Sequence, residues 1–207
     1  MFRSSKGLET GAWPPAKRWL ALLLLGLLAP FALAACGGSD SKAGGGGEHG
    51  GEHGEELLVE GEPFMVGPLR YNVLFTRPLN RFDVEDRDYL TGQPPPDPDE
   101  LYVGVFVEIQ NTDEEKGHRI PERFEILDTE GQRFENLETE SLYRLKTGTV
   151  LGPGDQDPAI DSTPQVGPIK AALLLYLVNQ DTLELRPIEM EIPGEEEGEV
   201  VRVELDL

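Results

Sequence analysis

A short repeat near the start of the chain carries residue types that bind transition metals. His49 and His53 stand in the sequence Glu-His-Gly-Gly-Glu-His-Gly over residues 48–54. Imidazole nitrogens interleaved with carboxylates suit borderline metals such as Zn²⁺ and Cu²⁺. The surrounding glycine-rich stretch offers no element to position these ligands and no outer hydrogen bonds to orient them. We interpret the repeat as low-complexity sequence and keep a metal-handling protein as the alternative.

Three acidic clusters offer oxygen ligands of the kind that calcium prefers, at residues 83–88, 97–100 and 155–161. Asp155 and Asp157 begin like an EF-hand loop, but that loop needs a glycine at its sixth position and a glutamate at its twelfth. Both are missing, and Pro158 interrupts the loop. We therefore predict solvated loop carboxylates, with Arg81 and Arg87 neutralising part of the first cluster.

Recognisable catalytic motifs are absent from the sequence. His118 is the only histidine outside the repeat, and we expect it to be an isolated surface residue. No Gly-x-Ser-x-Gly, phosphate-binding glycine loop or His-Glu-x-x-His occurs, and no dinucleotide fingerprint occurs between a predicted strand and a predicted helix. A carboxylate pair for glycoside hydrolysis stays open, because a sequence does not show which acids meet in space. We predict a protein that is not an enzyme and has no cofactor, with an uncharacterised hydrolase as a further alternative.

Cys36 is the only cysteine and follows a segment typical of export signals. Basic residues occur up to Arg18, and residues 19–35 are 17 uncharged and almost entirely apolar positions. A membrane-spanning helix needs ~20 apolar residues, so this length is marginal for a span and typical of a signal peptide. A single thiol also excludes an intrachain disulfide and any zinc site built on several cysteines.

The sequence Leu33-Ala34-Ala35-Cys36 resembles the lipobox of bacterial lipoproteins. The resemblance implies that the Cys36 thiol receives a diacylglycerol and that the chain is cleaved between Ala35 and Cys36. Two or three acyl chains anchor a protein stably, because each buried CH₂ contributes roughly 0.8 kcal/mol. It thus implies an exported protein without residues 1–35, anchored by its lipid to the outer face of the bacterial cell membrane.

The charge of the remaining chain limits its partners. The full sequence has 18 basic and 39 acidic residues, of which residues 1–35 hold four and one, leaving a formal charge of about −24. Such a surface repels phosphate backbones, which excludes nucleic acid as a partner. It also repels anionic headgroups, so the lipid on Cys36 must hold the protein at the membrane.

Residues 36–56 are predicted to form a flexible tether between the lipid and a folded domain. They are dominated by glycine and nearly lack apolar side chains, so they cannot bury enough surface to offset the entropy of ordering. A random coil of this length reaches roughly 25 Å.

Residues 57–207 contain short β-like runs separated by turn residues. The alternation predicts that Leu69, Tyr71, Val73 and Phe75 share one face of a strand. Seven or eight strands without a long amphipathic helix predict an all-β, antiparallel, immunoglobulin-like sandwich. The runs lie at residues 64–75, 101–109, 124–127, 132–134, 171–178, 188–192 and 200–207.

Three of these runs support more specific predictions. In residues 101–109, the odd-numbered side chains should face one core and the even-numbered ones the opposite side. Residues 128–131, Asp-Thr-Glu-Gly, suit a hairpin turn closed by a glycine bulge. Residues 171–178 are apolar on both faces, which favours a central strand.

Residues 66–73, 102–111 and 124–131 resemble the telokin-like, immunoglobulin-like domain of unknown function found on many secreted bacterial lipoproteins. The shared features are an early strand, an apolar strand ending in Asn111, and the Asp-x-x-Gly hairpin that follows. The resemblance covers roughly residues 60–207 and implies an extracytoplasmic β-sandwich without catalytic residues. We predict a non-enzymatic module that binds an envelope protein or a small ligand through its long loops or an edge strand.

Overall fold

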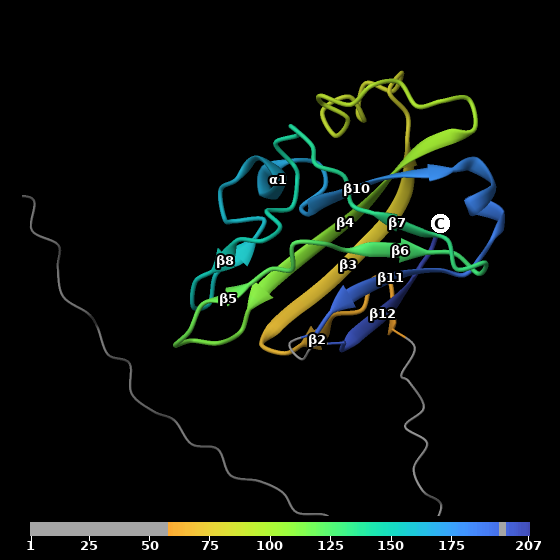
Figure 1. Cartoon of the computed structure of the whole chain (residues 1–207). Coiled ribbons are helices and arrows are strands. Elements are labelled where there is room, and N and C mark those ends of the chain that lie inside the picture. The colour runs from red at the N-terminus through yellow and green to blue at the C-terminus, as the bar shows by residue number, and fades with distance from the viewer. Residues whose placement is uncertain (1–57, 195–197) are drawn as a thin grey trace, which may run out of the picture. The chain divides into compact units, whose positions relative to one another are not determined.

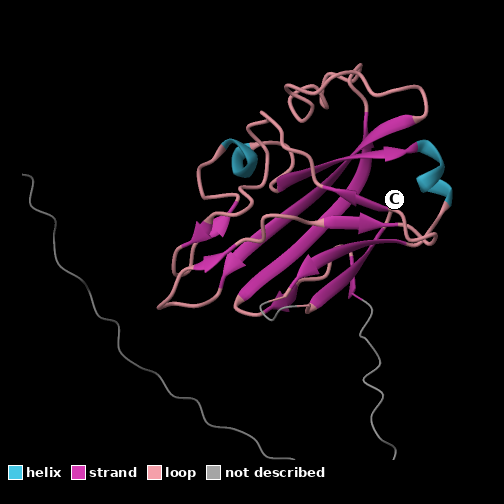
Figure 2. Ribbon diagram, in the orientation of Figure 1, coloured by secondary structure: helices cyan, strands magenta, loops and turns pink. Residues whose placement is uncertain are grey.

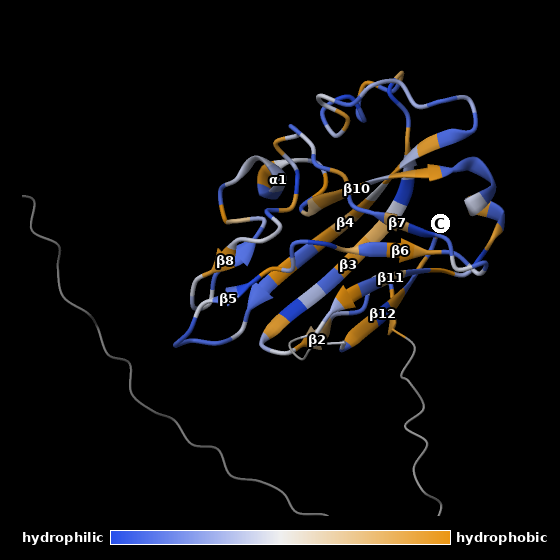
Figure 3. Cartoon of the chain, in the orientation of Figure 1, coloured by the Kyte–Doolittle hydropathy of each residue, from blue (hydrophilic) through white to orange (hydrophobic). Residues whose placement is uncertain are grey.

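The two longest strands pair antiparallel and form the centre of one sheet. The computed structural model describes residues 58–194 and 198–207. β3 (Leu69–Leu79) and β4 (Glu100–Asn111) run side by side, with β10 (Ala172–Asn179) on the far side of β4 and β2 (Phe64–Val66) on the far side of β3. β9 (Gln156–Asp157) also pairs with β4, near its C-terminal end. Apolar residues predominate along β4 and β10 in Figure 3, as strands with two covered faces require, whereas polar and apolar residues are mixed along β3.

The second sheet has the order β1, β12, β11, β6 and β7. Its strands span Leu58–Val59, Val200–Leu205, Ile188–Pro193, Glu125–Leu127 and Arg133–Glu135 in that order. β1 pairs with β12 in parallel, and the other neighbours pair antiparallel. Figure 1 shows this sheet crossing in front of the first.

Few other elements complete the described part of the chain. β5 (His118–Arg119) and β8 (Val150–Leu151) form a separate two-stranded ribbon, and the only helices there are α1 (Thr163–Val166) and the 3₁₀ turn η1 (Gln180–Glu184) (Figure 2). Eight of the described strands have three or more residues. The predicted all-β, immunoglobulin-like sandwich is therefore confirmed. None of the described helices is long and apolar enough to cross a membrane.

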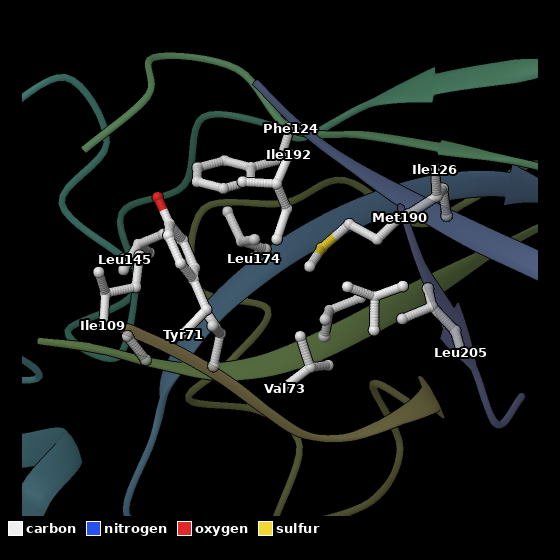
Figure 4. Close-up of a cluster of buried hydrophobic side chains, with 14 of the residues drawn as sticks. Tyr71, Val73, Ile109, Phe124, Ile126, Leu145, Leu174, Met190, Ile192 and Leu205 are labelled. Carbon is white, nitrogen blue, oxygen red and sulfur yellow. The ribbon is translucent and has the colours of Figure 1, made fainter. Parts of the chain in front are cut away.

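The first core lies between the two sheets. Val103, Val105, Val107 and Ile109 all face it from β4 and are fully buried, as the alternation predicted. Figure 4 shows side chains from both sheets meeting in this space. Burying one such side chain contributes roughly 1.5–3 kcal/mol, so the stability of this core is distributed over many residues. Its other labelled members include Tyr71, Phe124, Ile126, Leu174, Met190 and Ile192.

The second core covers the opposite face of β4. Tyr102 and Phe106 point into it, and Phe75 stacks on Phe106 with ring centroids 4.7 Å apart. The prediction that Phe75 shares a face with Val73 was wrong. A β-bulge shifts the pairing between these two residues, and one extra residue turns every later side chain to the other face.

β10 lies at the border of its sheet, so the prediction of a central strand was wrong. Its side chains are apolar on both sides because Leu174 enters the first core while Leu173 and Leu175 enter the second. Residues 137–145 cover its free edge through backbone hydrogen bonds, from Leu145 N to Leu173 O at 2.8 Å and from Leu137 N to Leu175 O at 2.7 Å. Burial on both faces therefore does not reveal the place of a strand in its sheet.

The predicted hairpin between β6 and β7 is confirmed. Asp128 Oδ1 accepts hydrogen bonds from the backbone N of Glu130 and of Gln132, each at 3.0 Å. Gly131 has φ +81°, a left-handed conformation that closes the turn and that glycine adopts without strain.

Candidate functional site

A hollow of about 440 Å³ opens beside β8 and β9, in the long loop region that follows β7 and precedes α1 (Thr163–Val166). We call it the loop hollow. It is formed by the chain between Lys146 and Ile160, which enters and leaves the two short strands through turns. Its lining residues are Lys146, Thr149, Val150, Leu151, Gly154, Asp155, Gln156, Asp157, Ala159 and Ile160.

Two short strands attach this loop region to the sandwich. β9 pairs with the end of β4, with Asp157 opposite Ile109, and the backbone N of Asn111 donates to Asp155 O at 2.9 Å. β8 pairs with β5, with Leu151 opposite His118. The hollow is therefore built on backbone hydrogen bonds to the longest strand of the fold.

The buried side chain of Asn111 connects the two attachments. Its Nδ2 lies within hydrogen-bond distance of three carbonyl oxygens, those of Lys116 (2.8 Å), Gly152 (2.9 Å) and Leu151 (3.2 Å). Its Oδ1 accepts from the backbone N of Asp113 at 3.0 Å. One amide thus holds the turn after β4 against β8, and its buried carbonyl partners would be costly to leave unsatisfied.

Asp157 fixes the other wall of the loop hollow. Its side chain is buried, and Oδ2 accepts a hydrogen bond from the backbone N of Lys146 at 2.8 Å. Burial raises the pKa of Asp157, while the hydrogen bond and charge of Lys146 act in the opposite direction. The carboxylate therefore serves to hold the chain at Lys146, whose own side chain is exposed.

The rim of the loop hollow carries large aliphatic side chains in water. Val150 is 55% exposed and Ile160 is 74% exposed, although both residue types are usually buried. Lys146 and Asp155 are exposed between them. The Thr149 hydroxyl donates to Lys146 O at 2.7 Å and so is engaged in the turn. A few apolar residues beside a few polar groups on a rigid frame are suited to binding.

The acidic clusters do not assemble into a metal site in the described residues. Within 58–194 and 198–207, no three His, Cys, Asp or Glu side chains are grouped as metal ligands. The third cluster is divided, since Asp157 is buried against Lys146 while Asp155 is exposed. In the second cluster, Glu100 Oε2 accepts from the backbone N of Asp97 at 3.2 Å.

The first acidic cluster is neutralised by a different arginine from those predicted. Asp86 is buried and forms an ion pair with Arg77, with Nη1 3.2 Å from Oδ2 and a second contact between Nη2 and Oδ1. Asp86 Oδ2 also accepts from the backbone N of Asn80 at 2.8 Å. The prediction named Arg81 and Arg87, because sequence proximity did not reveal that the loop folds back onto β3.

His118 is neither isolated nor fully exposed, contrary to the prediction. It lies in β5 with 24% of its side chain exposed, and its Nε2 is 2.9 Å from Asp113 Oδ2. This hydrogen bond, together with those from the backbone N of Glu115 and Lys116, lowers the pKa of Asp113 to about 2. The pair stabilises the turn that Asn111 also holds.

Six predicted site residues lie outside the described part of the chain. They are the lipobox residues Leu33, Ala34, Ala35 and Cys36 and the repeat histidines His49 and His53.

The exposed rim of the loop hollow was missed by sequence reasoning. A partial signal was present at Ile160, a lone large apolar residue between Pro158-Ala159 and Asp161-Ser162 that no strand pattern requires. Val150 offered no such signal, because its neighbour Leu151 is buried and the two form an ordinary strand fragment.

No protein-family model and no curated protein sequence matches this chain. Among solved structures, the chain is similar to the yjhA protein from Bacillus subtilis, with a TM-score of 0.43 and 15% identity over 72% of this chain and 100% of that one. It is also similar to an uncharacterised β-sandwich protein from Clostridium difficile 630, with a TM-score of 0.42 and 10% identity over 75% of this chain and 99% of that one.

Proposed function

We propose that the protein is an extracytoplasmic lipoprotein, anchored through Cys36, whose β-sandwich is a non-enzymatic binding module for another envelope protein. The lipobox and the telokin-like resemblance of residues 60–207 support this cellular placement. The loop hollow is the contact site in this proposal. The partner presents a basic surface with a small apolar anchor, which complements an acidic protein that exposes aliphatic residues.

The observation that carries this proposal is the exposure of Ile160 and Val150 on a rigid frame. Asn111 and Asp157 hold both sides of the loop through their side chains, so a partner would lose little chain entropy by docking there. Isolated exposed apolar residues occur on most surfaces, but here two of them line one hollow.

Site-specific photo-crosslinking in intact cells tests the contact. A photo-reactive amino acid is placed at position 160 or, as a matched control, at position 84, because Ile160 and Val84 are both 74% exposed. We expect position 160 to give a discrete crosslinked partner that Val150→Asp abolishes, and position 84 to give none. The same set of abundant proteins from both positions would contradict the proposal.

The anchor is tested separately. Cys36→Ser removes the thiol that accepts the lipid, so we expect loss of radiolabelled palmitate and either release from the membrane fraction or accumulation of the uncleaved chain. Lipid labelling that is unchanged in this variant would refute the anchor while leaving the binding module open.

A further inference from the structure

The outer face of the sheet of β10, β4, β3 and β2 changes from aromatic to polar toward the end of β4. Phe106 belongs to the second core, whereas the next two side chains on the same face are those of Glu108 and Gln110. A pocket of about 150 Å³ opens over them, and we call it the polar pocket. Its polar lining consists of Arg70, Asn72, Glu108, Gln110, Gln156 and Gln165.

Three neighbouring strands place these side chains in register. Gln110 of β4 lies opposite Arg70 of β3 on one side and opposite Gln156 of β9 on the other. Residues directly opposite each other in a sheet share a face, so these three form one row across the strands. Glu108 stands in the next row, opposite Asn72. The floor of the polar pocket is therefore part of the sheet itself, which holds the backbone of each lining strand in place.

Two side chains of opposite charge line the polar pocket without contacting each other. Arg70 and Glu108 lie on neighbouring strands, at diagonal positions that long side chains can bridge. Within residues 58–194 and 198–207, however, neither forms an ion pair or a side-chain hydrogen bond. Arg70 is exposed, and the carboxylate oxygens of the half-buried Glu108 are accessible to water. The pocket thus presents one cation and one anion that a ligand can reach.

Amide groups complete the lining. Gln156 Nε2 donates to Pro158 O at 3.1 Å, which orients this amide and leaves its Oε1 as an acceptor. Gln110 forms no side-chain hydrogen bond in the described part of the chain, so its amide offers a donor and an acceptor beside both charges. The two apolar residues of the lining, Tyr71 and Ile109, direct their side chains into the first core (Figure 4). A large apolar group would therefore find little surface to pack against in this pocket.

The volume of the polar pocket limits the size of its ligand. At roughly 30 Å³ per molecule, the pocket holds about five waters. A ligand that displaces these waters has a similar number of non-hydrogen atoms, which excludes an oligosaccharide, a nucleotide or a long peptide.

We propose that the polar pocket binds a small α-amino acid in its zwitterionic form, with its carboxylate against Arg70 and its ammonium against Glu108. The planar guanidinium can bind both oxygens of a carboxylate, and a carboxylate suits the compact charge of an ammonium. A zwitterion pairs with both charges at once, whereas a simple anion or cation leaves one of them unpaired. The surrounding amides and the small volume favour glycine or serine. The proposal does not rest on the proposed protein contact, although Gln156 lines both the polar pocket and the loop hollow.

Calorimetric titration of the full chain with glycine and L-serine tests the site. The matched control ligands are glycolate, which lacks the ammonium, and ethanolamine, which lacks the carboxylate. We expect dissociation constants in roughly the millimolar range for the two amino acids, because ligands this small form few contacts. Each control should bind about tenfold more weakly or worse, since it loses one set of charge-assisted hydrogen bonds. L-Leucine should also bind more weakly than glycine, because its side chain exceeds the volume of the pocket.

Substitutions in the pocket assign each charge to its part of the ligand. Arg70→Gln and Glu108→Gln should each weaken glycine binding about tenfold or more. Arg70→Gln should also abolish the preference for glycine over ethanolamine, and Glu108→Gln the preference for glycine over glycolate. Arg87→Gln and Glu62→Gln remove the same charges from exposed positions outside the pocket and should leave every affinity unchanged.

Thermal unfolding shows whether the variants keep the fold, and the comparison of ligands on the wild-type protein does not depend on them. Glycolate that binds as tightly as glycine would overturn the proposal in favour of a simple anion site at Arg70. Ethanolamine that binds as tightly as glycine would overturn it in favour of a cation site at Glu108. An absence of heat from both amino acids at concentrations well above the millimolar range, or unchanged binding in both pocket variants, would also overturn it.

Discussion

The sheet of β10, β4, β3 and β2 is buried on both faces, but by different means. Its inner face contacts the other sheet through side chains that alternate along regular strands. Its outer face is covered by loop residues 80–99 and by residues 137–145, around the aromatic side chain of Phe106. Tyr89 contacts Phe106 edge-on with centroids 5.2 Å apart, and Tyr143 contacts Tyr89 at 4.9 Å.

The two faces differ in the kind and number of contacts that stabilise them. The first core consists of many similar apolar contacts, so no single polar group determines it. The cover of the second core depends on few hydrogen bonds, such as Ser141 Oγ to Asp88 O at 2.7 Å and Gln93 Nε2 to Glu138 O at 2.9 Å, which join its two loops. We therefore expect the loss of a loop contact to unfold only the loops around it, and the loss of a core contact to destabilise the whole domain.

The largest effect is expected in the first core. Phe124 is fully buried there, and Phe124→Ala should lower the free energy of unfolding by about 3–5 kcal/mol, through lost burial and the cavity left behind. Denaturant unfolding followed by fluorescence and circular dichroism measures the change. Phe82, which is 83% exposed, provides the control, and Phe82→Ala should have almost no effect. Similar losses for both variants would show that the inner face does not dominate stability.

A smaller and more local effect is expected at Asn111. Asn111→Ala leaves buried carbonyls of the loop region without a donor and should cost about 2–3 kcal/mol. Hydrogen exchange should accelerate first in residues 111–117 and 150–157, before the strands of the first core. Uniform acceleration across the domain would contradict the distinction between local and global failure.

The ion pair under the second core should contribute less. Asp86→Ala removes the partner of Arg77, which is one-third exposed and also lies 5.9 Å from the Phe106 ring. We expect a loss of about 1–2 kcal/mol, because solvent screens part of the interaction. Limited proteolysis should cut within residues 80–93 faster than in the wild type. Asp88→Ala changes an exposed acid in the same loop, and an equal acceleration in that variant would remove the assigned role of the pair.

The smallest effect concerns the outer face of the other sheet. Glu191 is hydrogen-bonded by Arg133 and by Arg202, whose Nη2 lies 2.9 Å from Oε1, and these contacts lower the pKa of Glu191. Its stabilising contribution is therefore complete above the unfolded pKa of about 4.3 and is lost as the pH falls through the lower folded value. The difference in melting temperature between wild type and Glu191→Gln should be present at pH 7 and vanish in strong acid. A difference in melting temperature that persists in strong acid would show that packing, and not the charge of Glu191, causes it.

The sequence was informative where a short pattern determines the structure. Val103, Val105, Val107 and Ile109 were assigned to one face because side chains in a strand alternate strictly. Asp128 and Gly131 revealed their turn because local hydrogen bonding and a positive φ require such residues.

Features that depend on distant segments were not predictable. The bulge before Phe75 has no signature in the residues around it, and the pairing of Asp86 with Arg77 arises only when the loop closes. The loop hollow is fixed by turns and by hydrogen bonds from Asn111, which lies about 40 residues before it in the chain.

The covering of β10 by residues 137–145 has a consequence for encounters between molecules. An uncovered edge strand presents a row of unpaired amide and carbonyl groups, and the same strand of another copy can pair with them. In this fold the backbone groups of Leu173 and Leu175 already form hydrogen bonds with the backbone of Tyr143, Leu145 and Leu137. Two copies of the protein therefore cannot pair through the covered part of β10, and residues 137–145 protect this edge against aggregation.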